Sequence, residues 1–415
     1  MGVKAGYKET EAGVIPEDWG CEYARDVGTF KGGAGFPLTA QGETSGEYPF
    51  FKVSDMNHAG NETFMTFANH HISESTRKRL GATAFPANSI VFAKVGAAVF
   101  LERKKILAQP SCVDNNMAAF VLNESRADFR YVHFLLLSKR LGALVATTAL
   151  PALNGKQLGG MALALPHLEE QRAIAKALSD VDALLSGLDR LIAKKRDLKQ
   201  AAMQQLLTGQ TRLPGFHGEW EVKRLGQLGN FIKGSGIRKD EAASGDYPAV
   251  RYGEIYTLHN NVVKEYRSRI SKEVASTAVL LREGDLLFAG SGETKAEIGK
   301  CAAFIDRFEA YAGGDIVILR STGLSPIFMG YLCNQPIVQR SKASKGQGDA
   351  VVHISAAALG SIEVALPSLS EQTAIAQVLS DMDAELAALE ARREKTRQLK
   401  QGMMQELLTG RTRLV

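Results

Sequence analysis

The spacing of apolar residues predicts two long amphipathic helices in this chain. Between residues 178 and 188 leucine or valine recurs at steps of three, four and three, and the same steps return between residues 379 and 389. This spacing is that of a coiled-coil seam. Strong helix formers occupy the positions between. Gly209 and Gly410 follow the last leucines and are expected to end the helices. From residue 180 to residue 208 the first helix would extend about 43 Å.

Both helices belong to an internal repeat. Residues 165–213 and 366–414 align at an offset of 201 without a gap, and 29 of the 49 positions are identical. The preceding segments match more faintly, at Trp19 and Trp220 and at two Tyr-Pro pairs. Lys31 aligns with Lys233 if one residue is inserted. The predicted organisation is a variable domain (1–164), a helical segment (165–213), a second variable domain (214–365) and a second helical segment (366–415).

One such helix alone would expose an apolar stripe to water, and the second copy can cover it. Two copies related by a pseudo-twofold axis would pack antiparallel. The variable domains are expected to be mixed α/β, with strands at 89–93, 117–122, 285–289 and 315–319 and helical patterns at 129–144 and 325–340. The predicted fold class is therefore α+β: two mixed α/β domains and a pair of long antiparallel coiled-coil helices.

Composition narrows the class of protein. The chain has 415 residues, an apolar fraction of 45%, and a net charge of +5. It contains no apolar run long enough for a membrane span and no apparent signal peptide, so we expect a cytoplasmic location. The four cysteines lack C-x-x-C spacing and are expected to be reduced thiols. The small positive charge does not prove nucleic-acid binding but permits local basic surfaces.

Several catalytic motifs are missing from the sequence. There is no N/D-P-P-Y/F motif of an adenine methyltransferase and no Walker A motif. His58, His70 and His71 lack metal-ligand spacing. Asp182 and Asp383 are expected near the helix starts, where their charge would suit the positive end of the helix. We therefore expect no catalytic residue, no metal site and no bound cofactor.

Three repeated features carry a family resemblance. The helices start with L-P-x-L-x-E-Q-x-A-I-A (165–175 and 366–376) and end with L-L-T-G-x-T-R-L (206–213 and 407–414). Each variable domain has a glycine-rich segment, then Tyr-Pro, then Phe-Ala. Over nearly its full length the chain resembles the DNA-specificity subunit of Type I restriction-modification systems. It departs from some relatives in lacking Thr-Pro after the glycines.

The resemblance implies a non-catalytic subunit that binds double-stranded DNA. Each variable domain would be a target recognition domain for one part of a split, asymmetric sequence. The helix pair would set the gap between the two parts and would dock two methyltransferase subunits, which motor-nuclease subunits then join for restriction. A spacer of about 43 Å exceeds one turn of B-DNA, about 34–36 Å, which agrees with two readers on one duplex.

Basic residues in local clusters, or kept in both copies, are the candidates for DNA contact. They are Lys31, Lys52, Arg77, Lys78, Arg79, Arg103, Lys104, Lys156, Lys233, Arg238, Arg251, Arg267, Lys342 and Lys345. Polar helix positions that are identical in both copies, and are expected to be exposed, are the candidates for partner binding. They are Gln171, Lys199, Gln200, Gln372, Lys400 and Gln401.

Other interpretations of the pattern stay open. For any single basic cluster the alternative is a solvated surface. For the whole chain the main alternative is a non-enzymatic coiled-coil scaffold whose variable domains bind proteins. A nuclease or methyltransferase in a single chain, and a restriction system with different partners, are further alternatives.

Overall fold

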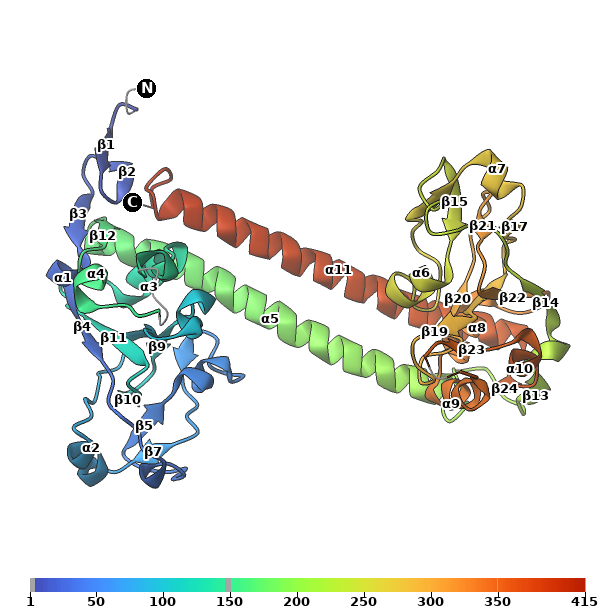
Figure 1. Ribbon diagram of the computed structural model, residues 1–415, viewed down its shortest axis with the longest axis horizontal. Coiled ribbons are helices and arrows are strands. Elements are labelled where there is room, and N and C mark those ends of the chain that lie inside the picture. Colours follow the sequence, from blue (N-terminus) through green and yellow to red (C-terminus); the bar gives the residue numbers. More distant parts are fainter. Residues whose placement is uncertain (1–3, 146–150, 349, 415) are drawn as a thin grey trace. The chain divides into compact units, whose positions relative to one another are not determined.

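A computed structural model describes residues 4–145, 151–348 and 350–414. The chain divides into two compact units (Figure 1). Unit 1 contains the residues up to Asp189 and those from Arg392 onward, and unit 2 runs from Arg190 to Ala391. Each unit therefore holds one variable domain together with a part of each long helix.

The two long helices are α5 (Leu168–Leu206) and α11 (Leu369–Leu407), each of 39 residues. Gly209 and Gly410 follow them with positive φ angles of 70° and 68°, a backbone conformation that glycine adopts without strain. The predicted helix ends are thus confirmed. The helices begin earlier than their leucine seam suggested, directly after the Leu-Pro pairs at 165–166 and 366–367.

Ion pairs within each unit define an antiparallel helix pair. In unit 1, Asp182 binds Lys400 at 2.6 Å and Asp189 binds Arg393 at 3.1 Å, so residue numbers rise along α5 as they fall along α11. Unit 2 shows the same order. Lys195 binds Glu385 at 2.6 Å, and Lys199, one turn later in α5, binds Asp383, which lies earlier in α11.

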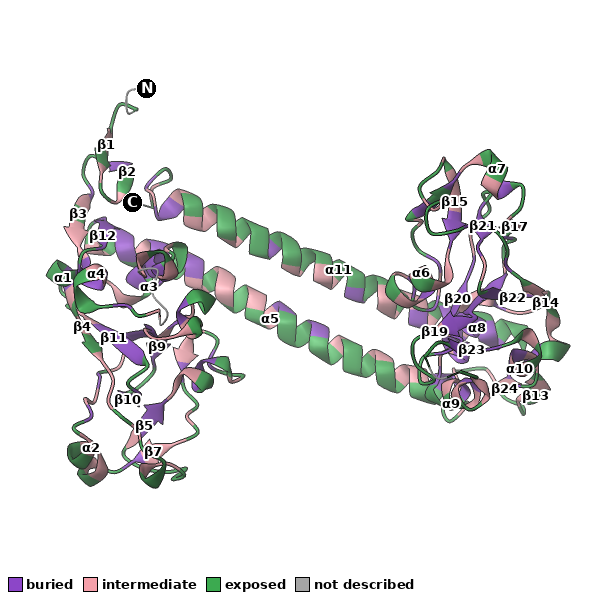
Figure 2. Ribbon diagram, viewed as in Figure 1, coloured by how far each residue is buried: buried purple, intermediate pink, exposed green. Residues whose placement is uncertain are grey.

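Four of the eight expected positions of the coiled-coil seam are buried, and the other four are partly exposed; the buried ones are Leu178, Leu188, Leu379 and Leu386. Most of the remaining surface of α5 and α11 is exposed, whereas buried residues gather in the central strands of the domains (Figure 2). The predicted α+β fold class, with its repeated antiparallel helices, is confirmed.

The variable domain of unit 1 contains two main sheets. The larger has the order β4-β11-β8-β9-β6 and the smaller β10-β5-β7, and two-stranded ribbons β1-β2 and β12-β3 complete the unit. The strand bounds are β1 Tyr7–Thr10, β2 Gly13–Pro16, β3 Gly20–Tyr23, β4 Gly28–Gly32, β5 Tyr48–Phe51, β6 Phe64–Met65, β7 His71–Ile72, β8 Ile90–Ala93, β9 Lys104–Leu107, β10 Cys112–Val113, β11 Met117–Leu122 and β12 Ala162–Leu165. Its short α-helices are α1 Ala24–Val27, α2 Glu74–Leu80, α3 Phe129–Ser138 and α4 Gly155–Gly159.

The variable domain of unit 2 repeats this plan. Its two four-stranded sheets have the orders β14-β22-β18-β20 and β16-β15-β21-β17, with ribbons β13-β24 and β19-β23. The strand bounds are β13 Glu221–Arg224, β14 Gly229–Lys233, β15 Tyr247–Val250, β16 Ser268–Ile270, β17 Val279–Leu280, β18 Leu286–Ala289, β19 Ser291–Gly292, β20 Cys301–Ala303, β21 Tyr311–Ala312, β22 Ile316–Ser321, β23 Val352–His353 and β24 Glu363–Leu366. Its α-helices are α6 Tyr252–Thr257, α7 Lys272–Ala275, α8 Pro326–Cys333, α9 Pro336–Lys345 and α10 Ala356–Gly360.

The strands predicted from the sequence correspond to β8, β11, β18 and β22. The first helical pattern forms α3 and a following 3-10 turn at Leu141–Leu144. The second divides into α8 and α9, because Pro336 begins a new helix at a position where its missing N–H costs nothing. Each domain core extends onto the helices, since Leu178 and Leu407 join the core of unit 1 and Leu206 and Leu379 join that of unit 2.

Candidate nucleic-acid interface

A pocket of about 370 Å³ in unit 2 gathers polar side chains from three separate segments of the chain. We call it the Lys233 pocket. Its charged and polar members come from the end of β14, from the residue before β22, and from the end of α9 with Gln347, β23 and Ser355 beyond it. The lining residues are Lys233, Gly290, Asp315, Val317, Lys345, Gln347, His353, Ile354, Ser355 and Ala356. Two of the residues predicted to contact DNA, Lys233 and Lys345, are thus brought together.

Backbone pairing holds the polar rim of this pocket in place. Gln347 and His353 exchange both backbone hydrogen bonds, at 2.9 and 2.8 Å. On its other side His353 pairs with Ser291 of β19, and the Ser291 hydroxyl lies 2.8 Å from Nδ1 of His353. The side chains of Gln347 and His353 remain exposed. The rim therefore presents amide and imidazole groups, which can donate to and accept from base edges.

The sequence interpretation missed His353 and Ser291 as candidate site residues. A signal for His353 exists: Ser355 and Asn154 cap equivalent helices at the repeat offset of 201. Counting back from them places His353 opposite Ala152, so only the second domain carries a polar side chain there.

The predicted equivalence of Lys31 and Lys233 is wrong. Phe30 pairs with Phe120, the fourth residue of β11, and Phe231 pairs with Leu319, the fourth residue of β22. Phe231 follows Phe30 by the repeat offset of 201, so no residue is inserted between these phenylalanines and the ends of β4 and β14. Lys233 therefore corresponds to Gly32, and Lys31 corresponds to Ile232. Since successive side chains of a strand point to opposite faces, Lys31 and Lys233 lie on opposite faces of their sheets.

Lys52 and Arg251 do occupy equivalent places. Each follows the Tyr-Pro strand and stands at the N-cap of a short helical segment. The backbone N–H of Lys52 donates to Asp55 at 2.6 Å, and that of Arg251 donates to Glu254 at 2.8 Å. The Lys52 ammonium also donates to Gln41 at 3.2 Å. Both basic side chains are partly exposed and are positioned by the same local motif.

Two of the predicted DNA-contact residues are buried. Lys342 is 0% exposed, and its ammonium donates to the Gly299 carbonyl at 2.6 Å. Lys104 is 2% exposed, and its ammonium binds Glu102 at 2.6 Å and the Lys139 carbonyl at 2.9 Å. Their ammonium groups are therefore engaged inside the domains, and burial lowers the pKa of Lys342. The sequence did not reveal that these two lysines are buried, because both stand among polar and charged residues of the kind found on exposed surfaces.

The other predicted contacts lie at the surface of their domains. In α2, Arg77 pairs with Glu74 at 2.6 Å and is partly exposed, and the Arg77 guanidinium lowers the pKa of Glu74 to about 2. The remaining candidates are exposed or partly exposed: Lys31, Lys78, Arg79, Arg103, Lys156, Arg238 and Arg267. Their role in DNA contact stays a prediction.

The glutamines of the repeated Glu-Gln motif make matching hydrogen bonds inside the two units. In unit 1 the Gln171 amide accepts from the N–H of Asp128 at 2.8 Å and donates to Pro166 at 2.9 Å. In unit 2 Gln372 makes the matching bonds with Ser325 and Pro367, at 3.0 and 2.9 Å. Each glutamine thus ties the start of a long helix to the N-cap of a domain helix.

The partner-binding prediction changes for this reason. Gln171 and Gln372 are 1% and 3% exposed, so the expectation that they are exposed is wrong. Lys400 binds Asp182, and Lys199 binds Asp383, within their own units. Gln200 and Gln401 remain exposed, and their contact with a partner stays a prediction.

The same ion pairs correct the role of the repeated aspartates. Asp182 and Asp383 were expected to complement a helix N-terminus, but each lies more than three turns inside its helix. Their carboxylates face lysines of the other long helix instead.

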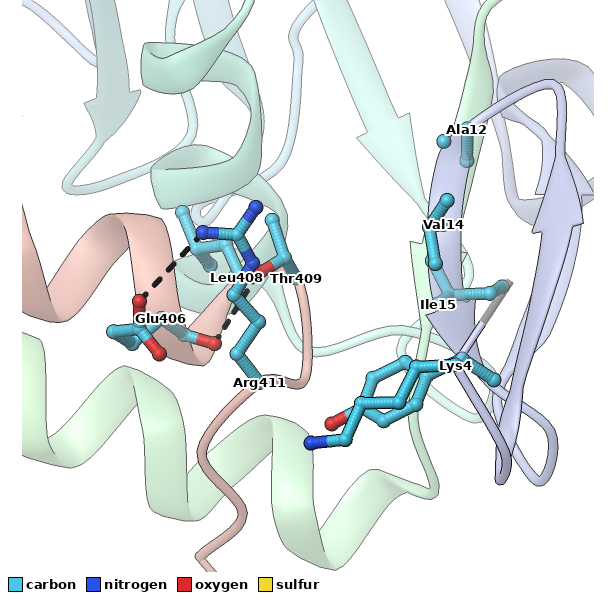
Figure 3. Close-up of a pocket in the computed structure, with 10 residues that line it drawn as sticks. Lys4, Ala12, Val14, Ile15, Glu406, Leu408, Thr409 and Arg411 are labelled. Carbon is cyan, nitrogen blue, oxygen red and sulfur yellow. Dashed lines mark hydrogen bonds and ion pairs between the residues drawn. The ribbon is translucent and has the colours of Figure 1, made fainter. Parts of the chain in front are cut away.

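Unit 1 has a larger pocket, of about 670 Å³, between the β1-β2 ribbon and the end of α11 (Figure 3). Val14 and Ile15 lie on one side, and Glu406 and Arg411 on the other, where they form an ion pair of 3.7 Å. The Tyr7 hydroxyl crosses to the Gly410 carbonyl at 3.1 Å. None of the predicted DNA-contact residues lines this pocket.

Within the described ranges 4–145, 151–348 and 350–414, no group of three or more His, Cys, Asp or Glu residues could hold a metal ion. No helix among those residues combines the length and apolar character needed to cross a membrane. Cys112 is buried, which raises the pKa of its thiol to about 11, and Cys21 is exposed.

The observed features define a class of protein: a tandem duplication in which two mixed α/β domains are each joined to long antiparallel helices. A family model for the Type I restriction modification DNA specificity domain matches residues 16–194 and again 217–400. The chain belongs to this family.

Relatives and solved structures agree with this assignment. The chain is 22% identical to the Type I restriction enzyme MjaVIII specificity subunit of Methanocaldococcus jannaschii, over 98% of this chain and 96% of the relative. It is 23% identical to the putative MjaX specificity subunit of that organism, over 98% and 97%. The S subunit of the Type I restriction-modification system from M. genitalium has a similar fold, with a TM-score of 0.59, 14% identity and coverage of 94% and 96%. A chain from a structural study of assembly of the Type I system gives a TM-score of 0.54 at 15% identity, covering 95% and 99%.

Proposed function

We propose that this chain is the DNA-recognition subunit of a Type I restriction-modification complex. Each variable domain reads one part of a bipartite, asymmetric target. The observation that carries the proposal is the contrast between the repeats: the helical segments share 29 of 49 residues without a gap, while the variable domains match only faintly. Two different readers on one duplex require a target without a palindrome.

The long helices are the proposed docking surface for two methyltransferase subunits. Leu198 in unit 2 and Leu399 in unit 1 occupy equivalent positions and are 48% and 59% exposed. Gln200 and Gln401 lie exposed two residues farther on. Apolar and amide side chains repeated in this way suit two copies of one partner, which would approach each helix segment identically.

The chemistry is assigned to those partners. The proposed roles of this chain are to position DNA and to assemble the complex, with no catalytic residue or bound cofactor of its own. Motor-nuclease subunits would join the methyltransferase complex for restriction, and the complex would act in the cytoplasm, where its DNA substrate lies. Family membership favours DNA recognition over a scaffold that binds only proteins.

Methylation mapping tests the proposal directly. The chain is co-expressed with its methyltransferase subunit, and modified adenines are located by long-read sequencing, with a control that lacks this chain. A split, asymmetric motif that is absent from the control is the expected result. A stable complex that gives no such motif would support the scaffold interpretation instead.

A further inference from the structure

Lys94 of unit 1 reaches across to Gly32 on a neighbouring segment of the sheet. If Gly32 carried a Cβ atom, the atoms within 4 Å of it, apart from its chain neighbours, would be Nζ and Cε of Lys94. Gly32 ends β4, and Lys94 follows β8, and both strands flank β11. The Lys94 ammonium therefore occupies the space above Gly32.

Unit 2 has the two residue types exchanged. Lys233 corresponds to Gly32, as the strand register established above shows. Gly290 corresponds to Lys94, because the Lys94 carbonyl accepts from Leu153 at 2.8 Å and the Gly290 carbonyl accepts from Ile354 at 2.9 Å. Lysine and glycine have thus changed strands between the domains.

Each domain therefore carries one lysine and one glycine at this pair of positions, with the lysine on opposite strands in the two domains, and in unit 2 Lys233 and Gly290 line the same pocket. A lysine that is only part of a solvated surface has no reason to be replaced by a lysine across the sheet. A glycine opposite each lysine is explained in unit 1, where a side chain at Gly32 would meet Lys94. What both domains keep is one lysine at this pair of sheet positions, whichever strand carries it.

The two domains differ at the polar rim, so what they share must meet something common to both half-sites. Bases differ between the half-sites, whereas the phosphate backbone does not. Resting on the proposed function, we infer that Lys94 and Lys233 are equivalent anchors that each bind a backbone phosphate of the DNA. Asp315 lines the Lys233 pocket, while Asn116 occupies the corresponding place in unit 1. Because a carboxylate reduces the local positive potential, we expect the Lys94 contact to contribute more to affinity.

Binding measurements on the complex with its methyltransferase subunits test the inference. The dissociation constants for target and non-target duplexes are measured over a range of salt concentrations. Lys94→Met should weaken both by about the same factor, on the order of tenfold, and should lower the slope of log K against log salt by about 1. Lys176→Met, which removes an exposed lysine of α5, is the control and should leave the slope unchanged.

Moving the lysine from position 94 to position 32 provides the sharper test. Lys94→Gly should weaken binding, and adding Gly32→Lys should restore affinity and slope, since Lys94→Gly removes the two atoms that crowd Gly32. This pair of variants recreates in unit 1 the arrangement of unit 2. Loss of affinity through misfolding would not be rescued by adding a lysine at Gly32, and thermal unfolding of each variant checks for it.

The outcomes separate the inference from the function on which it rests. A wild-type complex that methylates no split motif would remove both. A wild-type complex that methylates one, while Lys94→Met and Lys233→Met leave the salt slope intact, would overturn the anchors alone. So would a relaxed motif at one base pair, which would make these lysines readers of sequence, and so would a failed rescue by Gly32→Lys.

Discussion

Arg413 binds Glu170 through two guanidinium nitrogens, with Nε at 2.6 Å and Nη2 at 2.8 Å. Glu170 is buried and also accepts from the Trp19 indole at 3.1 Å, while Arg413 reaches Asp18 as well and lowers its pKa. The glutamate of one repeat thus meets the arginine of the other. Arg212 and Glu371 form the matching pair in unit 2, at 2.5 and 2.6 Å.

Arg413→Ala should destabilise unit 1, because it leaves the buried Glu170 carboxylate without its charge partner. The expected loss is on the order of 2 kcal/mol, less than for a fully buried pair, since water screens the partly exposed guanidinium. Hydrogen exchange of the segments around Trp19 and Glu170 should report it. Arg411→Ala, which removes a longer exposed pair, is the control, and equal protection in both variants would contradict the prediction.

His133 should make unit 1 less stable in acid. Burial holds its pKa at about 4, against an ordinary value of 6.5. Between these values the unfolded chain binds a proton that the folded chain does not, so the stabilisation is complete above pH 6.5 and is lost as the pH falls toward 4, by about 3 kcal/mol. Unfolding by urea across this range checks the trend.

His133→Asn should flatten the pH dependence of unit 1. The exposed His217→Asn serves as control and should leave it unchanged. The buried His259 also has a lowered pKa and gives unit 2 a dependence of the same sign, so the two units must be followed separately. An unchanged slope in His133→Asn would assign the acid sensitivity to other groups.

Gln347→Ala and His353→Ala should alter only one part of the methylated motif. Both side chains belong to the rim of the Lys233 pocket, and unit 1 has Ala152 where unit 2 has His353. Losing one good base contact costs about 1–3 kcal/mol of discrimination, so the motif should become degenerate at one or two positions. Motif mapping of each variant checks this, and a change in both parts of the motif would argue against it.

Replacing Gln200 and Gln401 together by alanine should weaken methyltransferase docking without changing stability. Both amides are exposed, whereas Gln171 and Gln372 are buried and should affect folding when replaced. Sedimentation of mixtures with the methyltransferase subunit separates the two effects. Intact complexes formed by Gln200→Ala/Gln401→Ala would exclude these amides from the docking surface.

Periodicity was sufficient to predict the helices. Repetition was sufficient to predict their antiparallel pairing, because two copies of one apolar seam can cover each other about a pseudo-twofold axis. Four of the domain strands, β8, β11, β18 and β22, were located because short apolar runs are typical of buried strands. The site was harder to predict, since burial of Lys342 and Lys104 depends on carbonyls brought close by tertiary folding. Matching Lys31 with Lys233 by identity also hid the real register, in which a glycine replaces a lysine.

The Glu170–Arg413 and Glu371–Arg212 pairs make the repeated segment complementary to itself in reverse direction. When the coding sequence of a self-complementary segment is duplicated, the second copy can bind the first. Tandem duplication therefore did not require a new interface to evolve. Substitutions in the helical repeat are then more constrained than substitutions in the variable domains. A residue of the repeat must fit its partner in the other copy, whereas each domain can change independently of the other.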